Sequence, residues 1–303
     1  MIPRIPIKRL LTDKEATKLC GLPVQDLEPT FTKPCVFYDE DTGEPVLATF
    51  EAPDIATYEK HILGLKWMER PEQHLTFGYR GKKPMMMQEG CEMAAFNRDH
   101  PETAAYLAAY SIKLAEIMAE LMPEIVIMNE DVIKQVLPDW RLSKASLWTS
   151  GVINYISQLP YHRDGNNFDA WSVMPVIRYG VTGGYLHLPE YGIVCPARNG
   201  HAIAFYGKKL VHGVTPMRKT KADGYRISCV YYALKGLKNC AAYAKEMADA
   251  RTKRMARERS MAERVESGIH IERLINKKTK SKDRVGRIST AFRPEAANGP
   301  EEK

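Results

Sequence analysis

The sequence lacks the features of a membrane-spanning or secreted chain. Its 303 residues contain no run of about 18 apolar residues, the length that a membrane-crossing helix needs. Residues 1–6 lack the apolar core of a secretory signal. The six cysteines are scattered without a Cys-x-x-Cys pair, which argues against a zinc site or a disulfide framework. We therefore expect a cytoplasmic protein with reduced thiols and no membrane partner.

The sequence also has no excess of positive charge before its C-terminal part. Residues 235–303 hold 18 Lys and Arg against 10 Asp and Glu, a net charge of +8, whereas the preceding residues sum to −1. A basic C-terminal arm on a neutral body favours a polyanionic partner, with nucleic acid first and the arm on its phosphates. A solvated helix followed by a loose tail explains the same composition, and the sequence leaves both interpretations open.

The hydrophobic pattern changes from helical to strand-like at about residue 147. Pro101 and Glu102 begin a helix with one apolar face that runs to about Met122. After residue 147, seven or eight short strand-like runs follow one another with Gly, Asn and Asp turns between them. This pattern is typical of a two-sheet jelly roll with the preceding helices packed on one sheet, an α+β protein.

The pattern predicts the following elements and regions. Helices are expected at 12–20, 54–66, 101–122, 129–136 and 240–266, and strands at 46–50, 148–156, 172–178, 184–188, 192–195, 202–206, 210–215 and 225–234. The expected regions are a helical and irregular extension (1–90), a jelly-roll core with supporting helices (91–236), a basic helix (237–275) and a disordered tail (276–303).

Two histidines and one aspartate form a candidate metal site. His162 and Asp164 are two residues apart, so both project to the same side of a strand, and His212 lies 48 residues past Asp164. Two imidazoles and a carboxylate can hold one face of an octahedral ferrous ion, leaving three positions for a bidentate 2-oxo acid and dioxygen. Arg226 and Ser228, on one face of a later strand, suit a ligand carboxylate.

This ordered set resembles the Fe(II)/2-oxoglutarate dioxygenases, whose fold is a cupin-like double-stranded β-helix. Residues 183–192, Gly-Gly-Tyr-Leu-His-Leu-Pro-Glu-Tyr-Gly, are similar to a segment of the ten-eleven translocation (TET) and J-binding protein branch, and so are residues 211–216. That branch oxidises the 5-methyl group of pyrimidines in DNA, and phages carry compact members. The resemblance covers about residues 90–235. It implies Fe(II), 2-oxoglutarate and O2 as cofactors, DNA as partner and, for a phage-encoded chain, the cytoplasm of a bacterial host.

The resemblance also implies roles for single residues. Asn167, with Asn166 as substitute, would hydrogen-bond a base flipped out of the duplex, and Tyr232 would stack on it. Arg98, in Phe-Asn-Arg, would pair with the other end of 2-oxoglutarate, opposite to the carboxylate held by Arg226. Asn154 is expected to line the cosubstrate pocket. A core tyrosine and ordinary strand packing explain Tyr232 and Asn154 as well.

Two departures from the family leave the substrate open. The cysteine-rich zinc region of TET enzymes is absent, and Leu234 stands where a TET histidine contacts cytosine. The sequence thus predicts oxidation of 5-methylcytosine to 5-hydroxymethylcytosine in DNA, with thymine as another target base. A hydroxylase of a protein or small molecule is the first alternative, and a non-catalytic nucleic-acid-binding jelly roll is the second.

Overall fold

The computed structural model describes residues 2–65, 73–82 and 90–266. Residues up to Met247 belong to one compact unit, and the chain from Ala248 onward to a second. The tail expected at 276–303 and the end of the basic helix expected to reach 275 lie outside the described residues.

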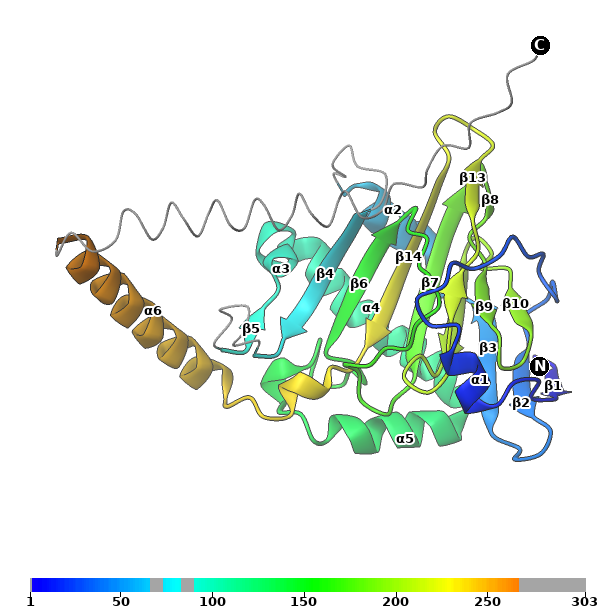
Figure 1. Ribbon diagram of the computed structural model, residues 1–303, viewed down its shortest axis with the longest axis horizontal. Helices are drawn as coiled ribbons and strands as arrows, with labels where there is room; N and C mark the ends of the chain where they lie inside the picture. Colours follow the sequence, from blue (N-terminus) through cyan, green and yellow to red (C-terminus); the bar gives the residue numbers. More distant parts are fainter. Residues whose placement is uncertain (1, 66–72, 83–89, 267–303) are drawn as a thin grey trace, which may run out of the picture. The chain divides into compact units, whose positions relative to one another are not determined.

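A nine-stranded sheet forms the centre of the first unit (Figure 1). Its strands in spatial order are β1 (Arg4–Ile7), β2 (Val36–Asp39), β3 (Pro45–Glu51), β11 (His201–Phe205), β7 (Ser172–Tyr179), β14 (Tyr225–Tyr232), β6 (Ser150–Tyr155), β4 (Gln73–Arg80) and β5 (Glu92–Met93). All neighbours pair antiparallel except β1 and β2. The chain is therefore mixed α+β with a large, mostly antiparallel sheet, as expected for a cupin-like protein.

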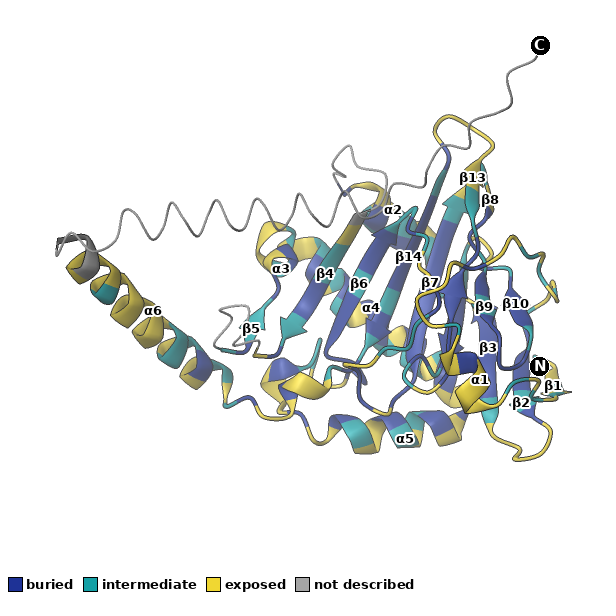
Figure 2. Cartoon of the chain, viewed as in Figure 1, coloured by how far each residue is buried: buried dark blue, intermediate teal, exposed yellow. Residues whose placement is uncertain are grey.

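Two small sheets accompany the large one. One consists of β10 (Ile193–Cys195), β9 (Leu186–Leu188) and β12 (Gly213–Val214), and the other of β13 (Met217–Lys219) and β8 (Val181–Gly183). Apolar side chains of the first small sheet, such as Leu186, share one buried cluster with Met174 and Phe205 of the large sheet. The large sheet and the three-stranded sheet thus enclose a core between them. Figure 2 shows β3, β7, β9 and β10 mostly in dark blue, the colour of buried residues.

Helices cover the other face of the large sheet. They are α2 (Ile55–Leu63), α3 (Ala95–Asp99), α4 (Pro101–Leu121) and α5 (Pro123–Ile133). The buried face of α4 recurs at helical spacing (Leu107, Tyr110, Leu114 and Met118) and packs in one cluster with residues of β6 and β14. The hydroxyl of Tyr231 donates to the carbonyl of Leu107 at 3.2 Å, which fixes α4 on β14. In Figure 1 this helix runs behind the sheet.

Most elements expected after residue 100 are confirmed, several with shifted ends. Helix α4 matches its prediction, whereas α5 starts six residues early because Pro123 fits a first helical turn. The strand expected at 210–215 reduces to β12. Helix α6 (Tyr243–Glu266) lies within the range 240–266 where a helix was expected, and α1 (Asp13–Thr17) is a shortened form of the helix expected at 12–20. Among the described residues no helix is both long and apolar enough to cross a membrane.

The expected extension at 1–90 needs correction. Strands β1 to β4 all belong to the large sheet, so this region is an integral part of the sheet and not an appendage. Strand β4 pairs with β6 over six residues although about 75 residues separate them. Pairing over such a long chain distance leaves no pattern in the sequence, so the sequence did not show that residues 1–90 belong to the sheet.

The cysteines also differ from expectation. Cys91 and Cys240 form a disulfide across 149 residues, with their Cα atoms 6.0 Å apart, whereas Cys20, Cys35, Cys195 and Cys229 are free thiols as predicted. The pair meets because residues around both cysteines pack in one apolar cluster with Trp140 and Leu237. Their distance along the chain hid this proximity from sequence reasoning.

Candidate metal centre and cosubstrate cavity

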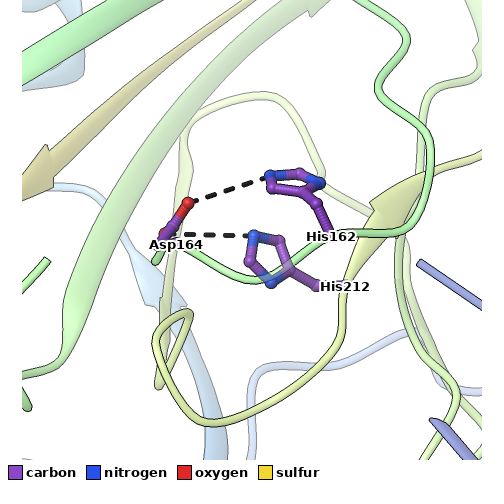
Figure 3. A group of neighbouring side chains, drawn as sticks. All are labelled: His162, Asp164 and His212. Carbon is purple, nitrogen blue, oxygen red and sulfur yellow. Dashed lines mark ion pairs between the residues drawn. The ribbon is translucent and has the colours of Figure 1, made fainter. Parts of the chain in front are cut away.

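His162 and His212 face each other on two antiparallel backbone segments. The backbone N–H of each donates to the carbonyl of the other, at 2.9 and 3.0 Å, which makes an isolated β-bridge. The prediction that both stand on regular strands is wrong, since the bridge is one residue long. The bridge nevertheless fixes the two backbones, so both imidazoles project to the same side (Figure 3).

Backbone carbonyls orient both imidazole rings. Nδ1 of His162 lies 2.8 Å from the carbonyl of Pro160, and Nδ1 of His212 lies 3.0 Å from that of Leu210. With the proton on Nδ1, each Nε2 keeps its lone pair for a metal, as is usual for metal-binding histidines. Burial lowers the pKa of His212, against the charge of Asp164, and this favours the neutral ring that a metal requires.

Asp164 completes the group (Figure 3). Its carboxylate oxygens lie 3.8 Å from Nε2 of His162 and 4.0 Å from Nε2 of His212. The three ligand atoms all lie within 4.8 Å of one another. A carboxylate and two imidazoles suit a divalent transition metal such as Fe(II). Gly207 permits this position of Asp164, because a Cβ there would collide with the carboxylate.

Arg226 lies on β14 with its guanidinium almost fully buried, at 1% exposure. Its Nη1 donates to the hydroxyl of Ser228 at 3.3 Å, while Nε and Nη2 have no hydrogen-bond partner among the residues that the structure describes. Burial lowers its pKa to about 10, with the positive charge of Arg178 adding to the effect, so the group remains charged at neutral pH. A buried cation with unpaired donors is unfavourable unless an anion binds it. The guanidinium therefore fits the carboxylate of 2-oxoglutarate.

Gly183 and Gly184 shape the wall beside Arg226. Both have left-handed backbone conformations, with φ of +71° and +69°. A Cβ at Gly183 would collide with the carbonyl of Pro216, and one at Gly184 would lie 2.7 Å from the Arg226 side chain. The Gly-Gly pair of the sequence motif is thus required by close packing against the aliphatic part of Arg226 and the segment after His212.

The metal ligands and Arg226 line one cavity of about 980 Å³. The structure places Asn154, Asn166, Asn167, Ser228 and Tyr232 on the same cavity, as expected. Asn154 is directly opposite Ser228 in the pairing of β6 with β14. Burial raises the pKa of Tyr232, so its phenol stays protonated at neutral pH.

Arg98 is the exception among the predicted residues. It is exposed on α3 and does not line the cavity. The Phe-Asn-Arg resemblance is explained by packing instead: Phe96 is buried in the main core, and Asn97 accepts a hydrogen bond from the backbone N–H of Gly78 at 2.8 Å. This segment thus holds α3 against β4 through that hydrogen bond.

Sequence reasoning missed the contribution of β4 to the cavity. Thr76, Arg80 and Lys82 all line it, although residues 75–98 showed no expected element. The signal was the alternation of Leu75, Phe77 and Tyr79, which is typical of a strand with one face buried. Arg80 and Lys82 then follow at the end of that strand.

Comparison with known proteins adds evidence on the fold. No family model matches the chain, and no curated protein matches its sequence. Among solved structures the chain is similar to NgTET1 in complex with 5mC DNA, with a TM-score of 0.52, 18% identity, and coverage of 72% of this chain and 83% of that one.

Two further structures are more distant. An oxidoreductase of the 2OG-Fe(II) oxygenase family from Burkholderia pseudomallei has a TM-score of 0.40 and 13% identity over 78% of this chain and 99% of that one. A bsmA homolog from Methylobium petroleophilum has a TM-score of 0.33 and 11% identity over 65% and 91%. The donor set and the unpaired guanidinium fit Fe(II), 2-oxoglutarate and O2 as cofactors, and the chain shares its fold with NgTET1.

Proposed function

We propose that this protein is an Fe(II)/2-oxoglutarate-dependent dioxygenase that hydroxylates the 5-methyl group of a pyrimidine in DNA. One observation carries the proposal. A group of two histidines and an aspartate faces the same cavity as a buried guanidinium with two unpaired donors. A site for a divalent cation and a site for a carboxylate thus lie together.

The residues have distinct roles in this proposal. His162, Asp164 and His212 hold Fe(II), and Arg226 with Ser228 holds the far carboxylate of 2-oxoglutarate. When bound, iron and 2-oxoglutarate supply with O2 the oxidising power that inserts one oxygen atom into a C–H bond. Apolar side chains that line the same cavity, such as Met174, Leu186 and Phe205, exclude water from the reacting carbon.

The DNA substrate is supported by the cavity and by the fold. NgTET1, which shares the fold, was solved with 5mC DNA. A base must leave the duplex to reach a buried metal, and an aromatic ring can then stack on it. Tyr232 is the cavity-lining aromatic that we assign this role, with Asn167 or Asn166 on a polar edge of the base. We prefer 5-methylcytosine, with thymine as the other base.

Three predictions from the sequence remain untested. They are membership in the phage-type TET and J-binding protein branch, a cytoplasmic location, and binding of phosphates by the basic C-terminal arm. The described part of that arm in α6 is rich in exposed Lys and Arg, which suits this role.

Mass spectrometry of nucleosides tests the function. Methylated DNA is treated with Fe(II), 2-oxoglutarate and O2 and digested. We expect 5-methyldeoxycytidine to gain about 16 mass units, one oxygen atom, as expected for hydroxylation of a flipped base. His212→Ala should abolish the product. His201→Ala is the matched control, because His201 lies on β11 away from the cavity and should keep full activity.

Other outcomes assign the alternatives. A gain on thymidine would change the target base. No gain on any nucleoside, with 2-oxoglutarate still converted to succinate, would favour a hydroxylase of proteins or small molecules. DNA binding without succinate would favour a non-catalytic nucleic-acid-binding protein.

A further inference from the structure

The cavity is unusually rich in positive charge. Among the residues that the structure describes, its lining includes one carboxylate, the metal ligand Asp164, and five cationic side chains: Arg80, Lys82, Arg163, Arg226 and Lys235. A neutral substrate would give no reason for this imbalance. The five cations differ, however, in whether the protein already neutralises them.

Two of the five are paired within the protein. Nη2 of Arg163 lies 2.7 Å from the carboxylate of Asp13 and 3.3 Å from that of Glu190. Nζ of Lys82 lies 2.7 Å from the carboxylate of Glu246. These two side chains therefore have structural partners and are not needed for a ligand.

Arg226 is buried beside Ser228 and is assigned to the cosubstrate. Arg80 and Lys235 remain. Within the described part of the chain, neither side chain has a hydrogen bond or an ion pair. Arg80 is half-buried and Lys235 is exposed, so both can reach a ligand that enters from solvent.

Arg80 and Lys235 lie at the same end of the cavity. Arg80 is the last residue of β4, and Lys235 begins the 3-10 turn η3 (Lys235–Leu237). The following glycines bring these segments together, since a Cβ at Gly81 would lie 2.8 Å from the backbone of Gly236. The two glycines thus let the backbones that follow Arg80 and Lys235 approach each other closely.

This cationic rim, Arg80 and Lys235, borders the proposed base-binding residues. The positive charge of Arg80 reaches Tyr232 and partly offsets the rise in the pKa of that phenol. The backbone N–H of Lys235 donates to the carbonyl of Asn166 at 3.1 Å. Asn167 pairs with Leu234, the residue before Lys235. An aromatic ring, two amides and two cations thus line one end of the cavity.

We infer that Arg80 and Lys235 bind the phosphate of the nucleotide whose base lies against Tyr232 and Asn167. The inference rests on the proposed function and deepens it, because it places the phosphate of the substrate on the protein. The same chemistry would bind the phosphate in a DNA strand or in a free mononucleotide, and we assign it to the strand.

The test measures DNA binding at several salt concentrations. Fluorescence anisotropy gives the Kd of a labelled duplex with one 5-methylcytosine, under nitrogen with Fe(II) and 2-oxoglutarate. The slope of log K against log salt is negative, and each phosphate that is no longer neutralised makes it shallower by about 0.9. Because both cations bind one phosphate, we expect Arg80→Gln/Lys235→Gln to reduce the steepness of this dependence by about 0.9 and to weaken binding by roughly 10-fold at 100 mM salt.

The control has the same loss of charge elsewhere on the surface. Lys60→Gln/Lys219→Gln removes two exposed cations, from α2 and β13, that do not line the cavity. It should leave the slope unchanged. Thermal unfolding at the wild-type temperature shows that each variant is folded. Equal slopes for the rim and control variants would overturn the inference.

Two further arms separate this inference from the proposed function. If the wild-type protein oxidises DNA but the rim variant has the same salt slope as wild type, the phosphate site is wrong and the proposed activity is retained. If the rim variant changes the salt slope but the wild-type protein does not oxidise DNA, the phosphate site is retained and the proposed activity is wrong. Displacement of the duplex by free 5-methyldeoxycytidine monophosphate at a similar Kd would overturn the assignment to a strand.

Discussion

Glu190 is a buried carboxylate that connects the two segments of the metal centre, and its substitution is a sharp test. Its Oε1 accepts from the backbone N–H of Val211, next to His212, at 2.9 Å. It also pairs with Arg163, which lies between His162 and Asp164 in the chain. The carboxylate is fully buried. We therefore predict that Glu190→Gln destabilises the protein and loosens its metal centre.

The magnitude follows from the contacts that remain. Glutamine keeps an acceptor for Val211 but removes the charge that pairs with Arg163. A hydrogen bond to a charged group contributes about 1.5–3 kcal/mol, and breaking a fully buried pair costs about 3–5 kcal/mol. Arg163 is partly exposed and keeps Asp13, so we expect a loss near the lower range, about 2 kcal/mol. For a chain of this size that lowers Tm by about 4–8 °C.

Asp13→Asn is the matched control, because Asp13 binds the same Nη2 of Arg163 from an exposed position. Exposed ion pairs contribute about 0–1 kcal/mol, so its Tm should fall by less than about 4 °C. Circular dichroism melts give both values. Titration with Mn(II) under nitrogen should show a weaker metal affinity in Glu190→Gln, because Glu190 holds Val211 and Arg163, the chain neighbours of the ligands. Losing a direct contact to a ligand weakens affinity by about 10–100-fold, which sets the upper limit here. Equal Tm shifts in the two variants, or an unchanged metal affinity, would refute the reasoning.

Three more predictions follow from single features of the structure. Arg226→Lys should raise the KM for 2-oxoglutarate by at least about 10-fold, because lysine cannot form the two-pronged pair; succinate production at varied 2-oxoglutarate measures this, and an unchanged KM would contradict it. Gly183→Ala should cost about 2–5 kcal/mol in urea unfolding, from left-handed strain plus collision, whereas Gly43→Ala, at the same φ of +71° but in open space, should cost only about 1–2 kcal/mol. Thiol titration of the denatured, unreduced protein should find four cysteines, and all six after reduction of the Cys91–Cys240 bond; six without reductant would show that the bond is absent in solution.

The sequence revealed the parts of the fold whose signals are local. Helix α4 was predicted because Pro101 starts it and its apolar residues repeat on one face. Strands β7, β11 and β14 were predicted because short apolar runs lie between turn residues. Strand β4 was missed although its residues alternate as in a strand, because its partner β6 lies about 75 residues later in the chain.

The candidate site shows the same limit in finer detail. The pattern of His162, Asp164 and His212 was sufficient to predict that they converge, and the structure brings them together. What holds them was not visible in the sequence, because the one-residue bridge and the ring contacts to Pro160 and Leu210 are made by backbone atoms. Arg98 shows the opposite case: its Phe-Asn-Arg motif matches the family, but the side chain does not line the cavity.

The strongest physical argument that the cavity binds an anion is the buried guanidinium of Arg226, which has no anionic partner among the described residues. The free protein gains nothing from it, since an apolar side chain of similar volume at a buried position is often as stable or more stable than a buried ion. The surroundings are nonetheless built around it, with Gly184 in a left-handed conformation against its side chain and Ser228 on one of its nitrogens. The fold therefore tolerates a local instability in the same cavity as three groups that suit a divalent cation. A ligand that supplies a carboxylate would remove this instability when it binds. A ligand with one carboxylate on this guanidinium and a second group that binds a metal suits both sites, and 2-oxoglutarate has that chemistry.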